Sequence, residues 1–161
     1  MILNLVLFQA GWLACVWGAA YGYAAEGVLA ALAIVAWHVS RAAEPRREAA
    51  LAAIAAAVGF AFESLLLQSG WVRVEAGVYW LVILWALFAT TLNYSLRALQ
   101  PRPWIAAAVG AIGGPLAYYA GARIGAIDFV QPAAMLAALA AGWALATPAL
   151  LSLARRLQAA P

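Results

Sequence analysis

Long apolar runs alternate with short polar connections along the 161 residues of this chain. A helix that crosses about 30 Å of hydrocarbon needs roughly 20 apolar residues. Six runs approach this length, so the pattern predicts an all-α, polytopic membrane helical bundle of about six transmembrane helices. We expect a single transmembrane domain covering residues 1–161, with spans at about 2–22, 24–40, 48–70, 78–96, 104–121 and 132–154.

The composition excludes a water-soluble domain. Hydrophobic residues make up 68% of the chain and charged residues 9%, and the mean hydropathy is +0.93. A soluble protein of this size needs a more charged exterior. The single cysteine, Cys15, excludes an intramolecular disulfide, and the single histidine, His38, excludes bis-histidine haem ligation within one protomer. We therefore expect no metal, no cofactor and no catalytic constellation.

The charges between the runs predict the orientation in the membrane. Nine arginines and no lysine are present, seven on one side of the six-span arrangement and two on the other. The positive-inside rule then places both termini in the cytoplasm. The interruption at 21–27 is weak, and fusing the first two runs changes only the side of the N-terminus. The first run lacks a basic leader, so we do not expect a cleaved signal. The net charge of +3 reflects topology, and no nucleic-acid partner is expected.

Small residues predict where helices approach one another. Gly11, Cys15 and Gly18 follow heptad spacing in the first run, and Gly110 and Gly114 form a small-xxx-small pair in the fifth. The segment Gly113-Gly114-Pro115 is a candidate helix break. It indicates either a packed kink or a broken helix that exposes backbone groups to a ligand, as in secondary transporters.

One candidate polar site lies in the outer half of the predicted bilayer. Glu63 stands inside the third span, where an ionisable residue costs roughly 2.5–3.5 kcal/mol. We expect it to point into the bundle. Arg123 is the first candidate partner, and Tyr118 and Tyr119 are alternative donors. The alternatives left open are a structural pair, a proton or substrate site, and a contact with a lipid headgroup.

A second polar cluster is predicted near the cytoplasmic face. Asn4 and Gln9 reach the same depth as Thr90 and Asn93 of the fourth span. Interhelical amide bonds of this kind stabilise helix association modestly, by about 0.6 kcal/mol. His38 lies one turn before Arg41 and is expected to be an interfacial side chain.

Several segments together resemble an uncharacterised bacterial multi-pass family, domain of unknown function 2878. The most specific are Thr90-Thr91-Leu92-Asn93 and Gly113-Gly114-Pro115; the others are Asn4 with 8–12 and Cys15, 63–66, 87–89, 95–96, 110–112, Leu116, Tyr118 and 121–123. The resemblance implies a multi-pass protein of the bacterial inner membrane with no assigned activity, encoded near lipid-modifying enzymes. Tyr94 departs from the histidine expected there, which weakens an acid–base role at that position.

Three classes of function compete. The favoured hypothesis is a bundle that binds lipid or an apolar ligand and assists envelope lipid modification. The second is a small proton-coupled transporter that uses Glu63, for which a homodimer is one way to form a pathway. The third is an intramembrane enzyme, which is less favoured because Ser64 beside Glu63 points about 100° away on a helix and no nucleophile elbow is present.

Overall fold

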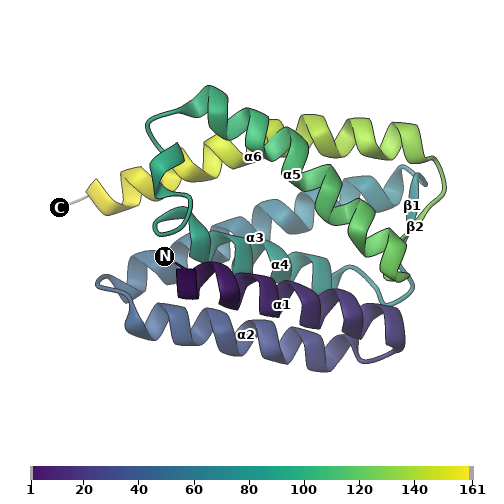
Figure 1. The fold of residues 1–161 in the computed structure, drawn as a ribbon, viewed down its shortest axis with the longest axis horizontal. Helices are drawn as coiled ribbons and strands as arrows, with labels where there is room; N and C mark the ends of the chain where they lie inside the picture. The colour runs from purple at the N-terminus through teal and green to yellow at the C-terminus, as the bar shows by residue number, and fades with distance from the viewer. Residues whose placement is uncertain (1, 160–161) are drawn as a thin grey trace.

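The computed structural model describes residues 2–159 as a bundle of six α-helices (Figure 1). A short 3₁₀ helix and a two-stranded antiparallel sheet lie in the connections. The elements are α1 (Ile2–Tyr21), α2 (Ala24–Arg41), α3 (Pro45–Gln68), β1 (Val72–Arg73), α4 (Tyr79–Leu92), η1 (Arg97–Leu99), α5 (Pro103–Ile124), β2 (Asp128–Phe129) and α6 (Pro132–Ala159). The predicted all-α bundle is confirmed.

Five of the six helices are long and apolar enough to cross a membrane, and only α4 is shorter. Proline at the first position begins α3, α5 and α6, where its missing N–H has no helical partner in any case. Gly125 ends α5 in a left-handed conformation, with φ of 98°, and its N–H donates to the carbonyl of Gly121. The helix boundaries therefore follow from local sequence signals.

The helices form three antiparallel pairs, α1 with α2, α3 with α4, and α5 with α6. Helix α4 lies inside the bundle and packs against α1, α2, α3 and α6. Its side chains Trp80, Trp85 and Leu87 are at most 1% exposed. Helix α5 packs along α6 and makes only a few contacts with α1.

Helix α4 is shorter than the predicted span at 78–96, because it ends at Leu92. Its 14 residues cover about 21 Å, less than the hydrocarbon thickness. The amide of Gln100 donates to the carbonyl of Leu92 at 3.1 Å, and so satisfies an end group that another helical turn would have bonded.

The predicted small-residue contacts are present between the helices. A Cβ on Gly27 would collide with the backbone of α1 at Ala14 and Cys15, and the Cys15 thiol lies 3.4 Å from the carbonyl oxygen of Gly27. A Cβ on Gly110 would collide with the backbone of α6 at Trp143. These glycines therefore set the closest approach of each pair.

The candidate helix break at Gly113-Gly114-Pro115 is not a break, because α5 continues as α-helix through it. Pro115 removes one backbone donor, but the hydrogen bonds on either side persist. Gly114 fits against the ring of Trp143 on α6, so the long α5–α6 contact supports the helix there. The segment therefore agrees with the packed alternative and not with a broken helix that exposes backbone groups.

The two ends of the bundle differ in charge. At the end where α1 begins and α6 ends lie the arginines of the α2–α3 connection, of η1 and of the last turn of α6, and this end is named the arginine-rich end (Figure 1). At the opposite end β1 pairs with β2, and Arg73 and Asp128 form an exposed ion pair at 3.9 Å. Exposed pairs of this kind contribute little stability.

Candidate functional site

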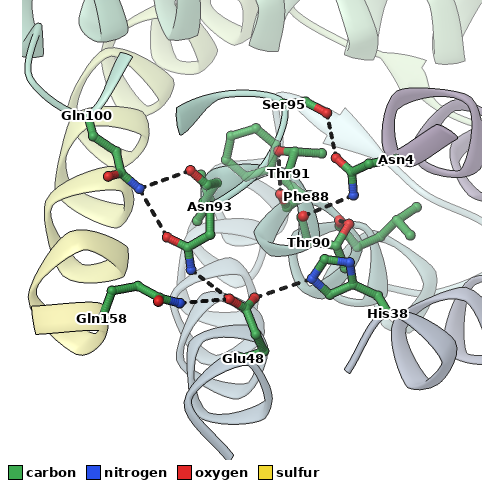
Figure 2. A network of polar contacts seen from close by, with 12 residues as sticks. Asn4, His38, Glu48, Phe88, Thr90, Thr91, Asn93, Ser95, Gln100 and Gln158 are labelled. Atoms are coloured by element: carbon green, nitrogen blue, oxygen red, sulfur yellow. Dashed lines mark hydrogen bonds and ion pairs between the residues drawn. The ribbon is translucent and has the colours of Figure 1, made fainter. Parts of the chain in front are cut away.

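A buried carboxylate organises the arginine-rich end. Glu48, in the first turn of α3, is 4% exposed and accepts hydrogen bonds from three elements (Figure 2). Asn93 Nδ2 and Gln158 Nε2 donate to Glu48 Oε1 at 2.8 and 3.1 Å, and His38 Nε2 lies 3.3 Å from Glu48 Oε2. Glu48 thereby joins α2, α3, α6 and the end of α4. Glu48 and the side chains bonded around it are named the Glu48 cluster, and they are His38, Asn93, Gln100 and Gln158.

Further hydrogen bonds lie around the end of α4 (Figure 2). Gln100 Nε2 donates to Asn93 Oδ1 at 3.0 Å. Asn4 Nδ2 donates to the carbonyl of Thr90 at 3.1 Å, and Ser95 Oγ donates to Asn4 Oδ1 at 2.6 Å. The hydroxyl of Thr90 turns back to the carbonyl of Leu87. Of the predicted inner cluster, the structure brings Asn4 to the backbone of Thr90, whereas Asn93 bonds Glu48 and Gln100 instead.

His38 and Gln9 lie differently from their predicted places. His38 is 8% exposed and packs edge-on to Tyr94, with ring centroids 4.8 Å apart, so it is a buried partner of Glu48. Gln9 is exposed on α1, outside the Glu48 cluster, and lines a groove described below. Burial and the neighbouring Glu48 carboxylate raise the pKa of Tyr94.

Glu63 occupies the middle of the bundle and is 2% exposed. Trp85 Nε1 of α4 donates to Glu63 Oε1 at 2.9 Å, and the hydroxyl of Tyr118 on α5 donates to the same oxygen. Tyr118 is itself 7% exposed. The carboxyl group thus connects three helices whose packed surfaces are otherwise apolar.

The remaining members of the predicted outer site lie elsewhere. Arg123 is exposed, and no ion pair joins it to Glu63 in the part of the chain that the structure describes. Tyr119 is 48% exposed on the outer face of α5. Tyr118, named as an alternative donor, is therefore the partner of Glu63, and the first candidate, Arg123, is not.

Aromatic side chains form a continuous layer beside Glu63. The rings of Trp85 and Trp143 stack with centroids 4.4 Å apart, and Phe62 and Phe88 meet these two rings edge-on. Phe8 of α1 extends the layer through an edge contact with Phe88. Edge and stacked geometries of this kind add to the free energy gained from burial.

A groove of about 530 Å³ runs between α1 and α5 above this aromatic layer, and is named the α1–α5 groove. Its walls include Phe8 and Trp12 of α1, Gly113 and Leu116 of α5, and Trp143 of α6. A smaller cavity of about 60 Å³ shares Phe8, Trp12 and Trp143 with the groove and reaches Tyr118 and Trp85. The groove therefore leads toward the hydroxyl that holds Glu63.

Three buried polar atoms along these cavities have no hydrogen-bond partner within residues 2–159. They are Thr147 Oγ1, on the wall of the α1–α5 groove, Trp80 Nε1, on the wall of the smaller cavity, and Trp143 Nε1, whose residue lines both. Thr147 is 1% exposed and Trp80 is 0% exposed. Buried polar groups without partners are uncommon in native proteins, and a bound molecule is one way to satisfy them.

Over residues 2–159, no group of three or more histidine, cysteine, aspartate or glutamate side chains is arranged to hold a metal ion. Glu48 and Glu63 are each surrounded by neutral or imidazole donors instead.

These features define a polytopic, all-α membrane protein with a buried polar end, an intramembrane carboxyl group and an apolar groove. The family model for proteins of unknown function DUF2878 matches residues 1–149, and the chain belongs to this family. No curated protein and no solved structure was found to match the chain.

Proposed function

We propose that this protein binds the hydrocarbon chain of a membrane lipid in the α1–α5 groove. The observation that carries the proposal is the groove itself, whose volume of about 530 Å³ falls in the usual range of ligand sites. Its rim carries exposed apolar side chains, Leu5, Val109 and Leu116, which in a membrane face the acyl chains of lipid. A lipid chain therefore reaches the groove without passing through water.

The polar atoms along the groove favour a ligand with polar groups as well as a chain. The Gln9 amide lines the groove and makes no hydrogen bond with the other described residues, and Thr147 Oγ1 is unpartnered. Both groups match the ester, hydroxyl or amide atoms near a lipid headgroup. In our proposal the protein lies in the bacterial inner membrane with both termini in the cytoplasm, and holds a lipid for enzymes that modify the envelope.

Filling the groove tests the proposal. Gly113 lines the groove, and a Cβ added there meets nothing within 4 Å. Gly113→Phe places a ring where the chain would lie without disturbing the α5–α6 contact. The matched control is Ala108→Phe, because Ala108 is exposed on the same helix and does not line the groove.

Native mass spectrometry of protein released from nanodiscs of phosphatidylethanolamine and phosphatidylglycerol measures the bound lipid and the oligomeric state together. We expect a lipid adduct on the wild type and on Ala108→Phe, and its loss from Gly113→Phe. Equal lipid retention by the two variants, or no adduct on the wild type, contradicts lipid binding in this groove.

Proton-coupled transport is a second candidate, favoured by the contact between Tyr118 and Glu63. Tyr118 lines the small cavity that adjoins the α1–α5 groove and donates to Glu63, so its hydroxyl joins a buried carboxyl to a ligand space. Ionisable groups at membrane depth mark proton relays in many carriers. Glu63→Gln in proteoliposomes separates the candidates, because it abolishes proton movement coupled to transport but leaves lipid adducts in place.

A further inference from the structure

A second cavity, of about 480 Å³, lies at the arginine-rich end where the ends of α3, α4 and α6 converge. Its walls carry Glu48, Asn93, Arg97, Gln100, Arg155 and Gln158. It shares no lining residue with the α1–α5 groove. It is named the terminal cavity, and whatever it binds is separate from a lipid chain in that groove.

The acidic groups of the terminal cavity already have partners. Glu48 accepts from Asn93 and Gln158 and lies beside His38. Glu44 pairs with Arg47 at 3.8 Å. Neither Arg97 nor Arg155 forms an ion pair with any residue from 2 to 159. The cationic groups in the lining of this cavity that no ion pair engages are therefore the two guanidinium groups.

Both arginines are placed by the Glu48 cluster in the same way. Arg97 lies three residues before Gln100, whose amide is fixed to Leu92 and Asn93. Arg155 lies three residues before Gln158, whose amide is fixed to Glu48. Residues three apart share a helical face, so each arginine lies on the same face as its glutamine, and both line the terminal cavity.

We propose that the terminal cavity binds a phosphate group between Arg97 and Arg155. A guanidinium presents paired N–H donors that match two phosphate oxygens, and two such groups neutralise the charge of the anion. The phosphate is carried either by a lipid headgroup at the membrane surface or by a small soluble molecule. The phenol of Tyr94 adds a neutral donor on the same wall, and burial and the Glu48 carboxylate raise its pKa further.

The test compares two double variants of equal charge. Arg97→Gln with Arg155→Gln removes the proposed ligands. Arg102→Gln with Arg156→Gln removes two exposed arginines at the same end that do not line the cavity. All four positions are exposed, so neither change buries a new group, and thermal unfolding in detergent verifies that both variants fold.

Two probes distinguish the sources of phosphate. Inorganic phosphate is titrated calorimetrically into protein in phosphatidylcholine nanodiscs, and phosphatidic acid is added to the same nanodiscs and its retention is measured by native mass spectrometry. We expect the first double variant to weaken binding of at least one probe by about tenfold or more, and the control to keep it within about twofold. Loss with inorganic phosphate assigns a soluble ligand, and loss with phosphatidic acid alone assigns a lipid headgroup. If neither probe binds, or if both variants weaken binding equally, the proposal is wrong.

Discussion

Replacing Glu48 by alanine tests whether the buried network at the arginine-rich end stabilises the fold. The change removes the acceptor of three donors from three different elements. A buried donor that loses its acceptor costs about 1–3 kcal/mol, whereas an exposed donor turns to water at little cost. The loss in the free energy of unfolding therefore depends on which of the three donors stay buried.

The exposure of each donor decides the estimate. His38 is 8% exposed and Asn93 is half-buried, so both lose a partner that water replaces poorly. Gln158 is exposed and contributes almost nothing. We expect Glu48→Ala to lower the free energy of unfolding by about 2–4 kcal/mol, and Gln158→Ala by less than about 0.5 kcal/mol.

Unfolding in mixed micelles of dodecyl maltoside and dodecyl sulfate, followed by tryptophan fluorescence, measures these free energies. Glu44→Ala is the matched control, because it removes a carboxylate from the same connection whose ion pair with Arg47 is largely exposed. A loss below 0.5 kcal/mol for Glu48→Ala, or an equal loss for Glu44→Ala, refutes the assignment of stability to this network.

Two further predictions concern the interior of the bundle. Tyr118→Phe leaves Glu63 with Trp85 as its donor and lowers the free energy of unfolding by about 1 kcal/mol in the same mixed micelles, and an unchanged value contradicts the role given to this hydroxyl. Gly110→Ala forces α5 away from the backbone of α6 and destabilises by about 1–2 kcal/mol, whereas Gly113→Ala has free space and stabilises by about 0.5–1 kcal/mol. The two glycine variants should therefore change the free energy of unfolding in opposite directions. Two losses of similar size would refute the packing described for α5.

The fold was largely predictable because the membrane restricts the alternatives. Each lipid-facing helix must satisfy its own backbone, so length and apolarity alone located the six helices. The exception was α4, whose predicted end at 96 was four residues too late. Its end depends on Gln100 and Asn93, which bond across a turn, and hydropathy contains no information about such bonds.

The partner of Glu63 was harder to predict, because sequence gives the depth of a residue but not the neighbouring helix. Arg123 and Tyr118 are five positions apart on α5 and point about 140° apart. A signal was nevertheless present. Tyr118 continues the buried small-residue stripe through Gly110 and Gly114 at a spacing of four, whereas Arg123 lies off that face.

Glu48 was missed for a related reason. It stands at the start of the span predicted at 48–70, directly after Arg46 and Arg47, and was given no polar role there, although Leu51, Ala52 and Ala55 lie three, four and seven residues later on one buried face. Extending that face by one turn toward the N-terminus places Glu48 inside the bundle. A charged residue at the first turn of an apolar stripe therefore merits the same attention as one in the middle of a span.

The short helix α4 explains why the candidate sites are linked. Trp85 in its middle donates to Glu63, and Asn93 at its end donates to Glu48. The phenyl ring of Phe88, between these two positions, lies on the wall of the α1–α5 groove. Because α4 is enclosed by four other helices, it cannot shift along its axis without breaking bonds to both carboxyl groups. The groove wall at Phe88 therefore belongs to a helix that is held at two polar points, one on each side of the groove.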